Sequence, residues 1–171
     1  MKSRDNRESG LTLIELLFVI TLMAIVARFS IPNILAVREN YELNSATKVA
    51  ASWLDDLRRE AIQNSVSCNA TWIEASGIIE RRCGNQAYDP NLNLDINATT
   101  TKTINISINS GYDNPWIFTP RGTTTTAGQV RFKLQDKPEN PGRSLKLTKP
   151  LALIRTGRCS NQDLCDYTNS F

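Results

Sequence analysis

The sequence predicts an α+β protein in which a long amino-terminal helix, apolar in its first half, packs on a small antiparallel β domain of sandwich type. Three observations predict this class. Apolar residues fill positions 11–31, a three- to four-residue period continues to about residue 64, and a two-residue period begins after residue 65. About 105 residues come after the helix, which is enough for one core and for no second domain.

The apolar segment, residues 11–31, is broken by few polar side chains, so as a helix it measures about 30 Å, one hydrocarbon core. It is therefore expected to span a membrane. Residues 1–10 hold three bases and two acids, and the positive-inside tendency keeps them cytoplasmic and exports the chain beyond Ile34. Residues 28–33 offer no small-x-small cleavage site, so the segment is expected to remain in the mature protein.

The start of this segment, Gly10-Leu-Thr-Leu-Ile-Glu15, with Pro32 further along the chain, resembles the class III signal of type IV prepilins and type II secretion pseudopilins. In that family a prepilin peptidase cuts after the residue that matches Gly10. The new amino terminus, here Leu11, is N-methylated, and the family more often has phenylalanine there. The resemblance also implies a partner for Glu15, the amino terminus of a neighbouring subunit.

Two residues, Glu15 in the apolar segment and Pro32 directly after it, are predicted to act in assembly. An ionised Glu15 carboxylate in hydrocarbon costs at least a few kcal/mol unless a partner neutralises it. The alternative is a polar side chain near a helix end that snorkels to the interface. Pro32 has no N–H and disfavours helix in the residue before it, so we expect a kink or local loosening of the helix there.

The second half of the helix is predicted to be amphipathic, with one packed stripe. Its end, residues 57–66, resembles the helix-end signature of the GspH/FimT branch of the same family. The chain then divides into a prepilin leader (1–10), a transmembrane or assembly half of the helix (11–34), an amphipathic half (35–64) and a GspH/FimT-like β domain (65–171), the lollipop of pilins. The predicted stripe comprises Ile34, Val37, Tyr41, Ala46, Val49, Ala50, Trp53, Leu54, Leu57, Ala61 and Ile62.

Residues 66–73 and 77–83 are predicted to form a β-hairpin, because both alternate and Gly77 can adopt a positive φ in the turn between them. A turn centred between Ala75 and Ser76 places Cys68 opposite Cys83. A glycine bulge would shift the pairing by one residue. Either register brings the two thiols close, and an exported protein can keep them oxidised.

Further half-buried antiparallel strands are predicted at residues 103–108, 116–119, 128–134, 144–149 and 151–155. Residues 88–103 and 135–142 are rich in loop-forming side chains and are predicted as loops.

Cys159 and Cys165 are expected to form a second disulfide near the carboxyl terminus. A metal site is the weaker alternative, because the chain has no histidine and no Cys-x-x-Cys pair.

Two more segments resemble the GspH/FimT branch. Residues 118–122 are similar to its Phe-x-Pro-x-Gly turn, and residues 154–158 to its terminal strand ending in Gly-Arg. In FimT-like minor pilins of competent bacteria, a Gly-Arg-x-Arg motif near the carboxyl terminus is tied to DNA binding. Here the match stops at Gly157-Arg158, because the second arginine is absent.

Charge is distributed unevenly. Residues 121–158 carry nine bases and two acids, a balance of +7, whereas residues 39–95 carry nine acids and five bases, a balance of −4. A basic strand region can contact DNA phosphates, or it can be a solvated face or a surface matched to acidic neighbours in a filament. Trp116 and Tyr112 could stack on bases, although aromatics near strands more often belong to the core. The candidate DNA-binding residues are Lys146, Lys149, Arg155 and Arg158.

Catalysis lacks support in the sequence, since there is no histidine to activate a nucleophile and no Gly-rich phosphate loop or paired-carboxylate motif. We therefore expect neither an enzyme nor a cofactor. The resemblance implies a minor pilin that joins a type IV pilus initiation or tip complex; the alternatives are a type II secretion pseudopilin and a DNA-binding minor pilin for uptake. The expected partners are other pilins, the prepilin peptidase and the inner membrane, with the carboxyl-terminal domain periplasmic before assembly and at the cell surface in the pilus afterwards.

Overall fold

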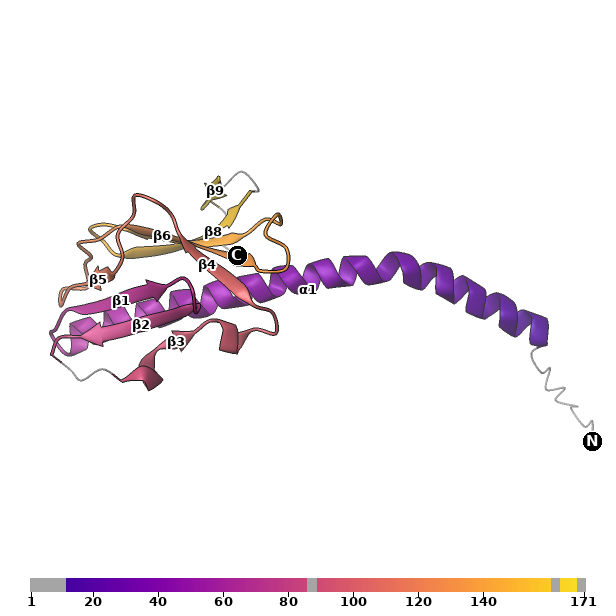
Figure 1. Cartoon of the computed structure of the whole chain (residues 1–171), viewed down its shortest axis with the longest axis horizontal. Coiled ribbons are helices and arrows are strands. Elements are labelled where there is room, and N and C mark those ends of the chain that lie inside the picture. The colour runs from indigo at the N-terminus through magenta and orange to yellow at the C-terminus, as the bar shows by residue number, and fades with distance from the viewer. Residues whose placement is uncertain (1–11, 86–88, 161–163, 169–171) are drawn as a thin grey trace, which may run out of the picture. The chain divides into compact units, whose positions relative to one another are not determined.

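The computed structural model describes residues 12–85, 89–160 and 164–168, apart from the side chains of residues 29–33 and 35 (Figure 1). The chain forms two compact units, residues 1–39 and 40–171. One long helix, two antiparallel sheets and two short 3-10 turns make up the described elements. This is the predicted α+β class.

Helix α1 (Leu13–Gln63) begins after a capping residue. The Thr12 carbonyl accepts from the Leu16 amide at 3.1 Å, and the Thr12 hydroxyl accepts from the Glu15 amide at 3.3 Å. Thr12 is thus an N-cap that satisfies a free amide of the first turn. The helix runs through Pro32 without ending, and it closes where Val66 donates to the Ala61 carbonyl beyond a left-handed Ser65 (φ 53°).

In the part of the chain that the structure describes, no helix is both long enough and apolar enough to cross a membrane. The membrane span expected at residues 11–31 is therefore not confirmed by the structure. The leader, residues 1–10, lies outside the described residues.

The second half of α1 packs through one face. The residues below 3% exposed recur at three- and four-residue steps, as an amphipathic helix requires. Four residues that the sequence pattern placed in the packed stripe are exposed instead, namely Ile34 (65%), Val37 (69%), Tyr41 (72%) and Ile62 (46%). Leu43 and Thr47 are buried although the pattern left them out. The buried face comprises Leu43, Ala46, Thr47, Ala50, Leu54, Leu57 and Ala61.

Sheet A has the strand order β3-β2-β1-β5, with β1 Cys68–Ile73, β2 Ile78–Cys83, β3 Leu94–Asp95 and β5 Trp116–Phe118. The hairpin has the predicted register, with Cys68 opposite Cys83 and Trp72 opposite Ile79. Gly77 has the expected positive φ, 71°. An ion pair between Glu60 and Arg81 ties α1 to β2.

Sheet B has the order β4-β6-β7-β8-β9, with β4 Ile104–Ile108, β6 Gly128–Leu134, β7 Arg143–Thr148, β8 Leu153–Cys159 and β9 Cys165–Asp166. All its neighbouring strands are antiparallel. Residues 40–63 of α1 lie beside the two sheets (Figure 1), and their buried side chains join one core cluster with those of both sheets. The two sheets and the helix therefore share one hydrophobic core.

Aromatic rings fill the centre of this core. Trp72 meets Trp116 edge-on, with ring centroids 5.0 Å apart, and Phe132 with centroids 6.1 Å apart. A Cβ at Gly128 would lie 1.8 Å from the Trp116 indole nitrogen, so glycine is required there for the ring to fit. Trp116 is fully buried, which excludes the base-stacking role considered for it and confirms the core alternative.

One strand prediction and one loop prediction are wrong in part. The strand predicted at residues 151–155 is β8, which begins at Leu153 because Ala152 adopts a left-handed φ of 53° that no strand residue has. The loop predicted at residues 88–103 contains β3 and the 3-10 turns Pro90–Leu92 and Asn97–Thr99, and its Ile96 is fully buried. The alternation of Leu92, Leu94 and Ile96 with Asn93 and Asp95 is a two-residue period that could have indicated this strand.

Disulfides join Cys68 to Cys83 and Cys159 to Cys165. The first links two buried residues of the hairpin over a separation of 15, and the second links β8 to β9 over a separation of 6. Both pairings are those expected from the sequence.

We expect the Cys68→Ser/Cys83→Ser variant to lose about 3 kcal/mol of unfolding free energy, since the bond closes a loop of that size in the unfolded chain. The matched variant Cys159→Ser/Cys165→Ser removes a disulfide that closes a shorter loop, so it should lose about 2 kcal/mol of unfolding free energy. Urea unfolding of the fragment that starts at Tyr41, which holds the whole described core cluster, measures both. A larger loss for the second pair would contradict this ranking.

Candidate assembly helix and basic sheet face

The candidate assembly segment is the first part of α1. Gly10 and Leu11 lie outside the described residues. Glu15 occupies the first turn and is exposed. With Thr12 it forms the Ser/Thr-x-x-Glu pattern of a capping box, in which the threonine hydroxyl holds the Glu15 amide. This contact uses the Glu15 amide, and the carboxylate belongs to an exposed residue of the first turn.

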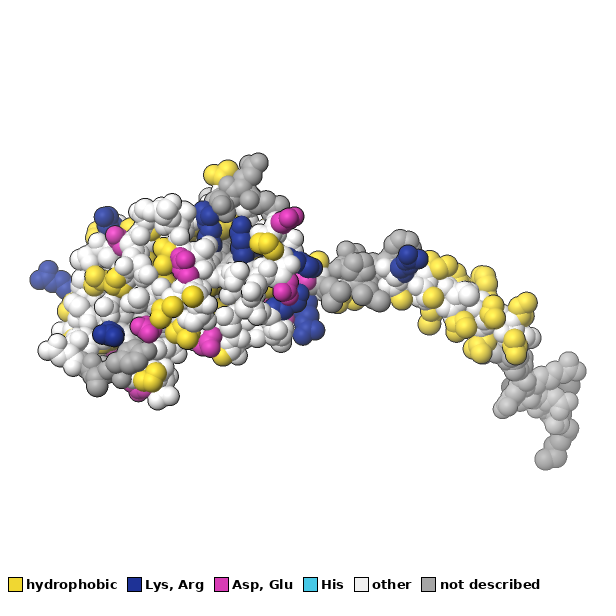
Figure 2. Space-filling view, viewed as in Figure 1, with side chains coloured by type: hydrophobic (Ala, Val, Ile, Leu, Met, Phe, Trp, Pro, Cys, Tyr) yellow, Lys and Arg dark blue, Asp and Glu magenta, His cyan; other side chains and the backbone are white. Residues whose placement is uncertain are grey.

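Apolar side chains around this carboxylate are exposed on every side of the helix. Figure 2 shows them as a nearly continuous apolar surface on this part of the molecule. A helix that is apolar all round is stable only when other apolar groups cover it. The exposed side chains are Leu13, Ile14, Leu16, Leu17, Phe18, Val19, Ile20, Leu22, Met23, Ile25 and Val26.

Strand register places two of the four predicted DNA-binding residues together. Lys146 on β7 pairs directly with Arg155 on β8, so both side chains lie on the same face of sheet B. Arg131 and Lys133 of β6 alternate with the buried Val130, Phe132 and Leu134, and the pairing of Arg131 with Ser144 puts them on this face too. We call these four residues, Arg131, Lys133, Lys146 and Arg155, the basic face.

The other two predicted residues do not belong to the basic face. Arg158 pairs with Arg143, and both lie on the side of sheet B that carries Leu145 and Leu147. Lys149 lies in the turn between β7 and β8. The prediction of one surface formed by Lys146, Lys149, Arg155 and Arg158 is therefore wrong, because side chains alternate along a strand and an odd step changes the face.

Arg143 lies on the opposite side of sheet B, where its guanidinium contacts α1. Its guanidinium is 4% exposed and donates from Nε to Asn44 Oδ1 at 2.5 Å and from Nη2 to Asn40 Oδ1 at 3.3 Å. Burial, and secondly the charge of Arg158, lower the pKa of Arg143. This arginine attaches β7 to α1 and is not accessible to a polyanion.

Tyr167 covers part of the outer side of sheet B. Its ring lies against Gly157, where a Cβ would come within 2.6 Å of it, and its hydroxyl is 2.8 Å from the Ser144 hydroxyl. The Lys146 ammonium lies 5.4 Å from the ring centroid, a cation–π contact. Burial is the main cause that raises the pKa of Tyr167, so its phenol is neutral at physiological pH and adds no negative charge beside Lys146.

Comparisons with known proteins found one sequence motif and two solved structures of similar fold. Residues 5–27 match the prokaryotic N-terminal methylation motif, a range that includes Gly10, Leu11 and Glu15. Two solved structures share the fold. One is the minor pseudopilin EpsH from the type 2 secretion system of Vibrio cholerae, with a TM-score of 0.52 and 10% identity over 67% of this chain and 95% of that chain. The other is the type IV minor pilin FimU of Pseudomonas aeruginosa strain PAO1, with a TM-score of 0.54 and 17% identity over 76% of this chain and 96% of that chain.

The chain carries the methylation motif, and its fold is similar to that of a minor pseudopilin and of a minor pilin. No curated protein sequence matches it. The methylation motif covers the amino-terminal segment, and the structural matches extend the likeness to the β domain at the level of the fold.

Two residues that organise these candidate sites were not singled out from the sequence. Thr12 could have been found, because Thr-x-x-Glu before an apolar run is a local capping signal. Tyr167 could not, since it reaches the basic face only after the disulfide-closed turn between β8 and β9 brings it back over Gly157.

Proposed function

We propose that this pilin-like protein is a minor pilin, a low-abundance subunit that joins the initiation or tip complex of a type IV pilus. The methylation motif carries the proposal, together with the helix on which it lies, whose exposed apolar side chains need a cover. Lipid provides that cover before assembly and the helices of neighbouring pilins provide it afterwards.

In this proposal the prepilin peptidase cuts between Gly10 and Leu11 on the cytoplasmic side, and Leu11 becomes the methylated amino terminus. Before assembly the protein remains anchored in the inner membrane with its β domain in the periplasm. On entry into the filament, the Glu15 carboxylate pairs with the positively charged amino terminus of a neighbouring subunit. This ion pair neutralises the Glu15 charge in its apolar surroundings. It thereby fixes the position of one subunit relative to the next.

The experiment is deletion of the gene, with two assays on the same strain. Loss of surface pili with normal protein secretion supports the minor pilin. A type II secretion pseudopilin, the alternative with the same fold, would instead leave pili intact and abolish secretion. Normal pili together with normal secretion would contradict both.

A second candidate function is DNA binding by the basic face. The observation that favours it is the direct pairing of Lys146 with Arg155, with Arg131 and Lys133 on the same face of the neighbouring strand β6. Four cations on one sheet face can contact successive phosphates without reading bases.

We expect the fragment that starts at Tyr41 to bind duplex DNA without sequence preference and with an affinity that falls steeply with salt. Lys146→Gln and Arg155→Gln should each lower the slope of log affinity against log salt by about one. Arg158→Gln is the matched control, because Arg158 lies on the other side of sheet B. Fluorescence anisotropy across a salt series measures the slopes, and an equal effect of all three variants would assign the binding to net charge alone.

A further inference from the structure

The strand β8 leaves part of its edge open. Cys159 donates to the Gly142 carbonyl of the chain beside it at 3.1 Å. Backbone groups alternate in an antiparallel pair, so Arg155 and Gly157 also face β7, while the N–H and C=O groups of Ile154 and Thr156 point the other way. Strand β9 covers only Arg158 and Cys159 on that side. Within the described residues, the outward groups of Ile154 and Thr156 have no backbone partner.

Side chains occupy some of the outward backbone groups on two other edge strands. On β5 the Ile117 amide donates to the Thr126 hydroxyl, and its carbonyl accepts from the Thr124 hydroxyl at 2.7 Å. On β4 the Ile104 amide donates to Asn97 Oδ1, and the Ile108 amide to Glu74 Oε1. Exposed edges promote pairing with other chains, and side chains occupy these positions on β4 and β5.

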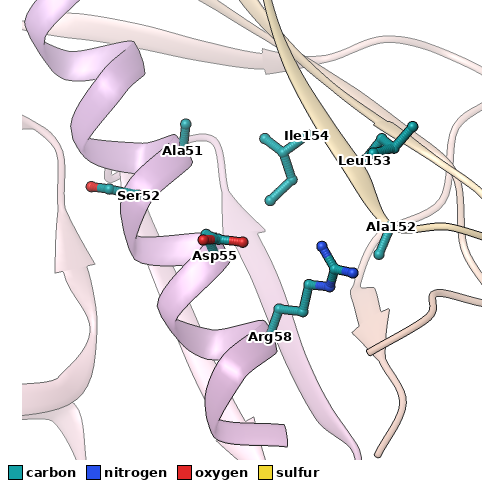
Figure 3. Close-up of a pocket in the computed structure, with 7 residues that line it drawn as sticks. All are labelled: Ala51, Ser52, Asp55, Arg58, Ala152, Leu153 and Ile154. Atoms are coloured by element: carbon teal, nitrogen blue, oxygen red, sulfur yellow. The ribbon is translucent and has the colours of Figure 1, made fainter. Parts of the chain in front are cut away.

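A groove accompanies the open edge. A pocket of about 390 Å³ lies between the second half of α1 and the start of β8 (Figure 3). Ile154 and Arg58 point into the space from its two sides in this view, and Asp55 lies near Arg58 on the helix. The floor thus offers apolar surface with one acid and one base. Its lining consists of Ala51, Ser52, Asp55, Arg58, Ala152, Leu153 and Ile154.

The two faces of β8 determine which side chains suit a strand added at its open edge. A residue placed opposite Arg155 would lie on the basic face next to Arg155, with Lys146 one strand further away, so a carboxylate is favoured there. The residues before and after it would lie over the groove, where apolar side chains fit against Ile154 and Ala51. The matching segment is an extended strand with an acidic residue between two apolar ones.

A second copy of the same edge fits poorly. Antiparallel pairing of two β8 edges through Ile154 and Thr156 would put Arg155 directly opposite the Arg155 of the other copy, and like charges in that position are destabilising. In the register that pairs Ile154 with Thr156, charge therefore favours a different chain as the occupant.

We propose that the open edge of β8 receives an apolar-acidic-apolar strand of a neighbouring, different pilin-like subunit, which extends sheet B across the subunit boundary. The inference rests on the proposed function, because it identifies the partner within the filament or tip complex. Main-chain hydrogen bonds to Ile154 and Thr156 supply the attachment, and Arg155 with the groove supplies the choice of partner.

Proline tests the edge directly. In Thr156→Pro the missing N–H is the outward one, so the pairing of β8 with β7 is retained and a proline on an edge strand is tolerated. Thr156→Val keeps the N–H and is the matched control. The full-length proteins are produced in a strain with its own pilus machinery, and their amounts in sheared filaments are compared with their amounts in membranes.

We expect Thr156→Pro to be incorporated about tenfold less than the original chain, and Thr156→Val to be incorporated normally. Arg155→Glu should also reduce incorporation whereas Arg155→Lys should not, a charge test that leaves the backbone unchanged. Thermal unfolding of each purified chain verifies that the variants fold. Normal incorporation of folded Thr156→Pro would overturn the edge proposal, and normal incorporation of Arg155→Glu would overturn the acidic partner. Absence of the unsubstituted chain from filaments would overturn the proposed function itself, and this inference with it.

Discussion

Glu15→Val is expected to leave the β domain folded and the chain in the membrane fraction, while its amount in filaments falls by at least about tenfold. The substitution removes one charge from an apolar, exposed helix, so membrane insertion becomes easier. It also removes the group that pairs with the amino terminus of the neighbouring subunit in the proposed assembly. Immunoblots of sheared filaments and membranes, normalised to total chain, measure the ratio.

Thr12→Val is the matched control for this prediction. It deletes the hydroxyl that caps the Glu15 amide and leaves the carboxylate in place, so it separates helix capping from charge pairing. We expect near-normal incorporation. Equal defects in the two variants would mean that Glu15 acts through the helix terminus, and normal incorporation of Glu15→Val would mean that its carboxylate has no docking partner.

Gly128→Ala is expected to have the largest effect on stability, a loss of about 3 kcal/mol or more of unfolding free energy. The added Cβ would lie 1.8 Å from the Trp116 indole nitrogen, and Trp116 is fully buried against Trp72, so neither ring can move without repacking the core. Urea unfolding of the fragment that starts at Tyr41 measures the loss.

A double-mutant cycle with Trp116→Phe is the control. The smaller ring leaves room beside residue 128, so Gly128→Ala should cost clearly less in that background. Equal losses in both backgrounds would place the cause in the backbone at residue 128 and not in the contact with the indole.

Local patterns account for the features that the sequence predicted correctly. The Cys68–Cys83 register results from a short turn with Gly77 at positive φ, and the buried faces of β4 and β6 result from simple alternation. The start of β8 was missed because a left-handed Ala152 has no sequence signature, since alanine rarely adopts that conformation. Strand β9, with two residues, is too short to show a period. Strand β3 lies within the alternation of Leu92, Leu94 and Ile96, which the prediction of a loop did not use.

The candidate sites were harder to predict for a different reason. Whether Arg155 and Arg158 share a face with Lys146 depends on the pairing of β7 with β8, and charge counts along the chain contain no register. The open edge of β8 likewise depends on how far β9 extends beside it. By contrast, the processing and assembly motif is contiguous in sequence, which is why residues 5–27 could be recognised directly.

Processing at the amino terminus and incorporation into a filament are the two events that the proposed function requires of this protein. Mass spectrometry of the chain recovered from sheared filaments measures both. We predict a mature protein that starts at Leu11, with one methyl group on its amino terminus and Glu15 unmodified. A terminus beyond residue 31, or a chain that is absent from filaments and still carries residues 1–10, would contradict the proposal.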